Sequence, residues 1–241
     1  MTYCVGIKVN EGMIFASDTR TNAGLDNFNS YSKMLEHQAE DRCIIILTSG
    51  NLATSQAVYN SIQKDLKNGQ GQANLNTFNE LEEIASYIGK LTVKHSSPDG
   101  INQEILQLGS TFILGGQIKG QKQELFLIYP QGNFIRPSEA KPYLVIGEIK
   151  YGKPILDRVI KNETSLGDAS RCALISMDSS IKSDLSVGPP IDFAVYKRDE
   201  LKLAYKQALK ADSPDYQEIS KQWEEGITKI FKNFPRFNWE K

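Results

Sequence analysis

The segment TYCVGIKVNEGMIFASD, residues 2–18, decides the fold of this chain. Apolar residues fill every second position from Tyr3 to Val9, which is the period of a half-buried β-strand. MIFASD (13–18) has the composition of a second strand, so we expect the two to form a β-hairpin. Gly12 predicts a loop of three residues, Asn10-Glu11-Gly12, because glycine suits the left-handed conformation at the third position of such loops. The residue before the first strand is therefore expected to be held by the fold.

Composition excludes several classes of function. The 241 residues carry a formal net charge of -1, with 40% hydrophobic and 24% charged residues. Such a chain can bury a large core, and its near-neutral charge predicts neither nucleic-acid binding nor attachment to an anionic membrane surface. The apolar run CIIIL (43–47) is too short to span a bilayer. Three cysteines without a CxxC pair, and no secretory signal pattern, lead us to expect a cytoplasmic protein with reduced thiols.

Strands and helices are predicted in blocks along the chain. Strand patterns dominate residues 2–50, helices are expected over 52–67 and 81–94, and more strands and helices follow. This order favours α+β layers over a βαβ repeat. No linker divides the chain, so we expect a single domain over 1–241 that includes an amphipathic C-terminal helix at about 213–234.

Three helix starts are predicted from capping residues. Asn51 precedes the first helix, and Ser165 with Asp168 precedes a later one. Thr77 and Glu80 have the spacing of a capping box ahead of the helix at 81–94.

Most catalytic and ligand-binding motifs are missing. His37 and His95 are the only histidines, and neither has a partner at metal-ligand spacing, so a surface or packing role is the plainer interpretation. The glycine-containing stretches match no phosphate-binding loop, and no GxSxG elbow occurs. The sequence therefore points to no metal and no organic cofactor.

Thr2 is the remaining candidate nucleophile. Methionine is removed from new chains when the second residue is small, and threonine qualifies. Removal of Met1 would leave a residue with both a hydroxyl nucleophile and a free α-amine, whose reference pKa of about 7.7–8.0 lets it act as a base. The alternative is that the sequence begins with Met-Thr and Thr2 has no catalytic role.

Asp18 and Lys33 are the charged groups expected near Thr2. With a three-residue loop, paired positions of the hairpin sum to 22, so Asp18 lies opposite Cys4 and on the face of Thr2. A two-residue loop would put Thr2 and Asp18 on opposite faces. Lys33 is an unexpected charge in SYSKML (30–35), and beside Thr2 it would favour the alkoxide and the neutral amine. An ordinary surface ion pair is the alternative.

At these residues the chain resembles the proteasome β-subunit family of N-terminal-nucleophile hydrolases. TYCVGIKVNEGMIFASDTRTNAG (2–24) is similar to that family's first hairpin, SKM (32–34) to its lysine segment, and LTSGNLATSQ (47–56) to its glycine turn. VIGEIKYGKPILDR (145–158) and SDLSVGPPIDFAV (183–195) extend the resemblance to most of the chain, and they favour the bacterial ancestral β-subunits, Anbu.

The resemblance implies a four-layer αββα sandwich and a role for each matching residue. Thr2 would be nucleophile and base, supported by Asp18 and Lys33, with the Gly50 N–H as oxyanion donor. Three further positions correspond to substrate-binding residues and two to supporting residues. The substrate-binding positions are Asn22, Thr48 and Leu52, and the supporting positions are Arg20 and Asp184.

The chain departs from the family pattern at two serines. Glu148 follows Gly147 where proteasome β-subunits carry a serine. Late in the chain Asp184 matches, but Val187 stands where the family has another serine, and Ser186 lies one place early. The hydroxyl network around the terminal amine is therefore expected to be altered.

We interpret the chain as a threonine-type peptidase or amide hydrolase that works inside a ring or helical homo-oligomer. A catalytically silent assembly subunit and a small-molecule amidohydrolase are the alternatives. No motif identifies the substrate or an unfoldase partner.

Overall fold

The computed structural model describes residues 2–22, 28–69, 73–96 and 108–240. Met1 lies outside these residues, as do parts of the polar stretch NGQGQANLN (68–76), expected to be a connector, and of the Ser/Pro/Gly stretch 96–100, expected to end the second helix. In the described part, no helix is both long and apolar enough to cross a membrane.

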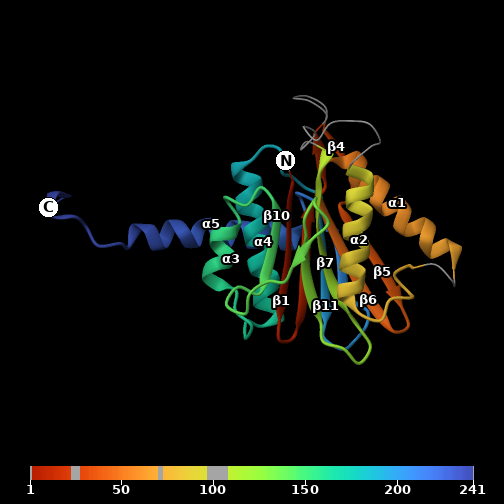
Figure 1. Ribbon diagram of the computed structural model, residues 1–241. Coiled ribbons are helices and arrows are strands. Elements are labelled where there is room, and N and C mark those ends of the chain that lie inside the picture. The colour runs from red at the N-terminus through yellow and green to blue at the C-terminus, as the bar shows by residue number, and fades with distance from the viewer. Residues whose placement is uncertain (1, 23–27, 70–72, 97–107, 241) are drawn as a thin grey trace.

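Two five-stranded antiparallel sheets form the centre of the molecule (Figure 1). The first sheet has the order β10-β1-β2-β11-β12, and the second has the order β5-β6-β7-β8-β9. A two-stranded sheet, β3-β4, stands beside them. The strands are β1 (Tyr3–Val9), β2 (Gly12–Asp18), β3 (Arg20–Asn22), β4 (Phe28–Ser30), β5 (Met34–Ala39), β6 (Arg42–Gly50), β7 (Ser110–Ile118), β8 (Glu124–Ile128), β9 (Phe134–Ile135), β10 (Tyr143–Gly147), β11 (Ile191–Lys197) and β12 (Leu203–Leu209).

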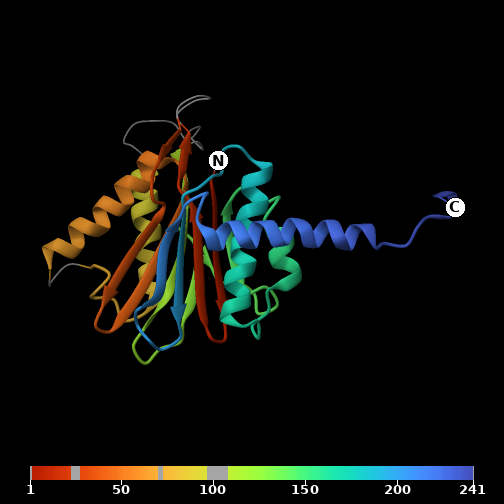
Figure 2. The same cartoon turned by 180° about the vertical axis from the view of Figure 1, so that it is seen from behind.

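Helices cover the outer face of each sheet, which gives the expected αββα sandwich (Figure 2). α1 and α2 lie on the second sheet, and α3 and α4 lie on the first. α5 packs on α4 and then leaves the body. The helices are α1 (Leu52–Asn68), α2 (Leu81–Ser96), α3 (Lys153–Val159), α4 (Leu166–Ser183) and α5 (Pro214–Lys232), followed by a short 3₁₀ turn (Asn238–Glu240).

The alternation of β1 sorts its side chains between two cores. Val5 and Ile7 face the α3/α4 layer and pack with Met177, whereas Cys4 faces the second sheet and packs with Leu47. A third core lies between the second sheet and α1 and α2. β1 therefore packs against both the α3/α4 layer and the second sheet. The residue before it lies at the end of the sandwich (Figure 1).

The β1–β2 hairpin has a two-residue loop, so the predicted three-residue loop is wrong. Val9 pairs with Gly12 and Cys4 with Ser17, and paired positions sum to 21 instead of 22. Gly12 is needed for close packing and not for loop closure, because a Cβ there would lie 2.0 Å from the carbonyl oxygen of Tyr196. The register argument that placed Asp18 opposite Cys4 fails with it.

Two of the three predicted helix caps are confirmed. The side chain of Asn51 accepts a hydrogen bond from Thr54 N (3.1 Å), and Ser165 accepts one from Asp168 N (3.1 Å). The capping box ahead of α2 is wrong, because the backbone N–H of Glu80 donates to Glu83 (3.1 Å).

The Thr77 hydroxyl of that proposed box donates instead to the Asn74 carbonyl (3.1 Å). A polar turn before α2 therefore competes for this side chain, as short hydroxyl residues allow.

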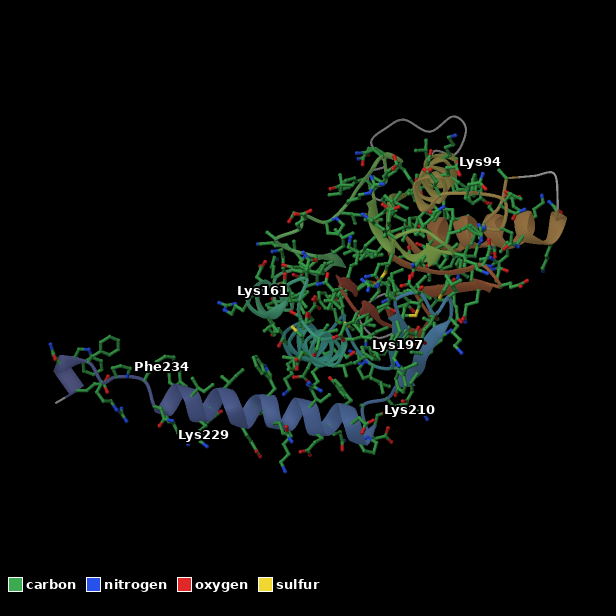
Figure 3. All side chains as sticks on the ribbon, turned by 90° about the horizontal axis from the view of Figure 1, so that it is seen from below. Lys94, Lys161, Lys197, Lys210, Lys229 and Phe234 are labelled. Atoms are coloured by element: carbon green, nitrogen blue, oxygen red, sulfur yellow. The ribbon has the colours of Figure 1, made fainter. Side chains whose placement is uncertain are left out.

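A polar cluster fastens the first half of α5 to α4. Tyr216 and Ser220 donate hydrogen bonds to the buried carboxylate of Asp178, at 3.0 and 2.7 Å. Lys182 bridges to Glu224 at 3.0 Å. Beyond this cluster the helix projects from the body, and Phe234 lies far from the sandwich (Figure 3).

Candidate active site

A buried ion pair lies beside the start of β1. Lys33 Nζ donates to Asp18 Oδ1 at 2.7 Å, and the Tyr3 N–H donates to the same oxygen at 3.0 Å. Asp18 is fully buried and Lys33 is nearly so. The carboxylate therefore joins the lysine to the first peptide after Thr2, although Asp18 is not opposite Cys4 as the hairpin prediction required.

The electrostatics of this pair have two opposing parts. Burial raises the pKa of the Asp18 carboxyl above its ordinary value. The charge and hydrogen bond of Lys33 oppose that change, as do the backbone N–H groups of Tyr3 and Gly188. Removing any of these partners would leave a buried charge with less compensation.

The backbone of Lys33 is also held in place. Its carbonyl accepts hydrogen bonds from Thr48 N in β6 and from the hydroxyl of Tyr59 in α1, both at 3.0 Å. Its ammonium donates a second hydrogen bond to the Arg20 carbonyl at 2.7 Å. No sequence pattern assigned a role to Tyr59; the available signal was an aromatic residue with a hydroxyl on the buried face of a helix.

Thr2 is fixed through its peptide groups. Its carbonyl accepts a hydrogen bond from Glu148 N at 2.7 Å. Gly147 has φ +91°, and a Cβ there would lie 1.8 Å from the Thr2 oxygen, so only glycine fits this approach. Among the described residues, no hydrogen bond links the Thr2 hydroxyl to the Lys33 ammonium.

Gly50 ends β6 with its N–H directed toward the side of the lysine. Asn51 N donates to Gly109 O on the β7 side, whereas Thr48 N donates to Lys33 O on the β5 side. Because successive N–H groups of a strand alternate in direction, the Gly50 N–H shares the direction of Thr48 N. β5 starts only at Met34, so no strand residue is paired with Gly50 on that side.

The three predicted substrate-binding positions come from three different elements. Leu52 is partly exposed at the start of α1, next to Gly50. Thr48 is buried, and its hydroxyl shares a hydrogen bond with Ser55 of α1 at 2.8 Å. Asn22 ends β3, where its backbone pairs with Phe28.

Arg20 and the end of α4 meet at the other side of the ion pair. Arg20 donates to the carbonyl of Leu185 at 2.6 Å, and a Cβ at Gly188 would lie 2.4 Å from the guanidinium carbon. Ser186 donates to Asp184 through both its N–H (2.8 Å) and its hydroxyl (2.6 Å).

Burial acts to raise the pKa of the Asp184 carboxyl, but the two hydrogen bonds from Ser186, together with the positive charges of the chain terminus and Lys150, hold that pKa below its usual value. Ser186 is therefore engaged with Asp184, one residue before the position at which the family carries its serine.

Within the described residues, no group of three or more His, Cys, Asp or Glu side chains is arranged to hold a metal ion. The charges at the site come from Asp18, Lys33, Arg20, Asp184 and Glu148. The arrangement combines a hydroxyl at the chain start, a buried cation nearby and an N–H at a strand end, which is a set suited to acyl transfer.

Comparisons with known proteins agree with this architecture. The model of the proteasome subunit family matches residues 2–196. The structure of Anbu (ancestral beta-subunit) from Yersinia bercovieri has a TM-score of 0.93 and 39% identity, with 98% of each chain covered. The comparison with curated proteins gives no match.

Two further solved structures are similar over nearly the whole length. The helical assembly of the Anbu complex from Pseudomonas aeruginosa has a TM-score of 0.92 and 38% identity, covering 98% of both chains. Anbu from Hyphomicrobium sp. strain MC1 has a TM-score of 0.90 and 37% identity, covering 98% of this chain and 99% of the other. The chain therefore belongs to the proteasome family and, within it, to the Anbu group of ancestral β-subunits.

Proposed function

We propose that this protein is a threonine-type amide hydrolase whose nucleophile is Thr2 after removal of Met1. The single observation that carries the proposal is the buried Lys33–Asp18 pair, whose carboxylate also binds the amide of the residue after Thr2. Burying two charges costs free energy that close pairing and hydrogen bonds must offset, so a buried pair at this point calls for an explanation. A lysine kept charged at this point would stabilise negative charge on a hydroxyl.

The proposed reaction needs only groups of this chain and water. Thr2 Oγ1 attacks the carbonyl carbon of the amide, and its proton passes to the α-amine of Thr2. The carbonyl oxygen becomes an oxyanion that accepts a hydrogen bond from the Gly50 N–H. Collapse breaks the C–N bond, and the leaving amine takes the proton from the α-ammonium. Water, activated by the same amine, then hydrolyses the ester and restores Thr2.

Other residues have supporting or substrate-binding roles in this proposal. Asp18 holds the Lys33 ammonium in place, and Arg20 and Asp184 fix the loop that follows α4. Leu52 and Asn22 flank the place of the substrate. Thr48 contributes through its backbone contact with Lys33, because its hydroxyl is occupied by Ser55. We assign the reaction to the cytoplasm, with peptides or other amides as the substrate class.

Intact mass and covalent labelling test this function together. We expect the purified protein to have lost one methionine and to react once per chain with an electrophile that captures both a hydroxyl and an adjacent amine. Loss of methionine without labelling or turnover at any pH would contradict the hydrolase. Retention of Met1 in the cellular protein would favour the silent assembly subunit, because the amine would stay acylated.

We also propose that the protein works as a homo-oligomer built through α5. The described chain exposes large apolar side chains along and beyond the outer half of this helix. Phe231 is 74% exposed and Trp239 is 81% exposed, which is unusual for a chain that stays monomeric. A second copy of the chain is the occupant that fits, since an Anbu complex from Pseudomonas aeruginosa forms a helical assembly.

Charges on the apolar face of α5 are expected to dissociate the assembly. Ile227→Glu/Ile230→Glu should lower the mass measured by light scattering at micromolar concentration, because two carboxylates would be desolvated in the contact. Gln222→Glu/Thr228→Glu adds the same charge outside that face and should leave the mass unchanged. A monomeric wild-type protein, or equal masses for both variants, would rule out this interface.

A further inference from the structure

Glu148 is a buried carboxylate to which the proposed reaction gives no role. It is 5% exposed, whereas its neighbour Ile149 is 46% exposed. Its Oε1 accepts a hydrogen bond from Lys150 N at 2.9 Å. No salt bridge of Glu148 is present among the described residues. A carboxylate kept from water in this way acts strongly on any charge beside it.

Strand pairing places Glu148 directly opposite Thr2. β1 and β10 pair so that positions sum to 150, as in Tyr3 with Gly147. Lys8 N donates to Pro142 O, and Glu148 N donates to Thr2 O, which are equivalent bonds at the two ends of the same ladder. Residues opposite one another in such a pair share a face of the sheet, with Cβ atoms about 5 Å apart.

The shared face is the one that looks between the two sheets. Cys4 and Ile146, the next pair along the ladder, both lie in the core between the sheets. The Thr2–Glu148 pair lies one step further, beyond the left-handed Gly147, and Glu148 N donates to Thr2 O at 2.7 Å. The backbones of the two residues are therefore adjacent, so the Glu148 carboxylate lies within one side-chain length of the Thr2 α-nitrogen.

The other charged groups at this end of the sandwich are largely paired. Asp18 from β2 is matched by Lys33 before β5. Asp184, after α4, is bound by Ser186, and Arg20 from β3 is directed at the Leu185 carbonyl. Lys150, after β10, is exposed.

The neutral thiol of Cys4 is the remaining titratable group, and burial raises its pKa above the ordinary value. Asp184 also acts on the chain terminus, whose positive charge helps to lower the pKa of that carboxyl. Glu148 is the carboxylate whose own backbone bonds to Thr2.

We propose that Glu148 pairs with the α-ammonium of Thr2 once Met1 is removed, and so keeps the base of the site protonated at neutral pH. Glu148 is a positioning residue in this scheme, since it acts through the amine and not on the substrate. The inference rests on the proposed removal of Met1. Its consequence is a hydrolase that is restrained near pH 7 and becomes active as the pH rises.

The expected size of the effect follows from the charge. An opposite charge within about 4–6 Å shifts a pKa by roughly 1–3 units in favour of the charged form. The Thr2 amine should then titrate about one unit or more above the usual 7.7–8.0 of an α-amine. Glu148→Gln should remove most of that shift, since the amide can still accept from Lys150 N but carries no charge.

Competitive labelling of the N-terminal amine tests the inference without any use of turnover. Protein beginning at Thr2 is treated with trace acetic anhydride over a pH series, and acetylation of the N-terminal peptide is read by mass spectrometry. We expect the midpoint in Glu148→Gln to fall by about one unit relative to the unsubstituted protein. Glu163→Gln removes an exposed carboxylate at the far end of β1 and should leave the midpoint unchanged.

Equal midpoints in Glu148→Gln and the unsubstituted protein would overturn the inference, even if turnover depends on Thr2. A shifted midpoint in a protein that neither hydrolyses amides nor labels at any pH would support the inference and refute the proposed hydrolase. If turnover is present, its acidic limb in kcat/KM should move to lower pH in Glu148→Gln by the same amount as the amine midpoint.

Discussion

Thr2→Ala is expected to abolish turnover and covalent labelling in protein that has lost Met1. The substitution removes the only hydroxyl on the terminal residue, and neither Lys33 nor Gly50 can replace a nucleophile. The measurement is hydrolysis of a panel of peptide and amide substrates, together with the mass increase on reaction with an electrophile specific for adjacent hydroxyl and amine groups.

Two controls separate loss of the nucleophile from loss of structure. Thr2→Ser keeps a terminal hydroxyl and should retain part of the labelling. His37→Ala alters a partly exposed histidine that contacts Asn76 and should not affect the reaction. If unsubstituted protein beginning at Thr2 labels no better than Thr2→Ala, the silent assembly subunit replaces the hydrolase.

Lys33→Ala is expected to reduce both activity and stability. Loss of one preorganised electrostatic group costs about 10²–10³ in rate. It also leaves the fully buried Asp18 without its counter-charge, which typically costs about 3–5 kcal/mol in the free energy of unfolding. Denaturant titration measures the second effect independently of turnover.

The pH dependence of that loss has a definite sign. Without Lys33, burial raises the pKa of Asp18 in the folded protein above its ordinary value of 3.8. A group whose pKa is higher when folded destabilises the protein as the pH rises from the unfolded to the folded value. The stability lost in Lys33→Ala should therefore be smallest near pH 4 and larger at pH 7.

Asp18→Asn/Lys33→Met provides the matching test of that explanation. It removes both charges, so most of the stability lost in Lys33→Ala should return while activity stays low. A single variant with unchanged stability, or a double variant less stable than Lys33→Ala at pH 7, would contradict a structural role for the pair.

The sequence predicted the layers of the fold but not the register of its first hairpin. The alternation from Tyr3 to Val9 predicted the strand, but the expectation of a half-buried strand was wrong: β1 is buried on both faces, because the small residues Cys4 and Gly6 pack against the second sheet. The hairpin loop was wrong because Gly12 can serve either a left-handed loop or close packing, and the close approach of Tyr196 is a tertiary contact. Family resemblance supplied the arrangement of the four layers.

Proximity of Asp18 and Lys33 could be anticipated from two charges next to strand-like residues, although the derivation used the wrong register. Asp18 ends its strand, and its carboxylate reaches the Tyr3 amide from there. The contact of Tyr59 with Lys33 was not predictable, because it joins α1 to a segment 26 positions away. Nor could the sequence pattern show that Ser186 would donate its hydrogen bonds to Asp184.

The projection of α5 has a consequence for symmetry. An arm that leaves one subunit and is received on the body of another makes a head-to-tail contact, with different surfaces on the two sides. Such contacts generate a closed ring or an open spiral, depending only on the rotation between successive subunits. The Asp178 cluster fixes the angle at which the arm leaves α4. In the assembly proposed above, a change in that angle would change the rotation between successive subunits.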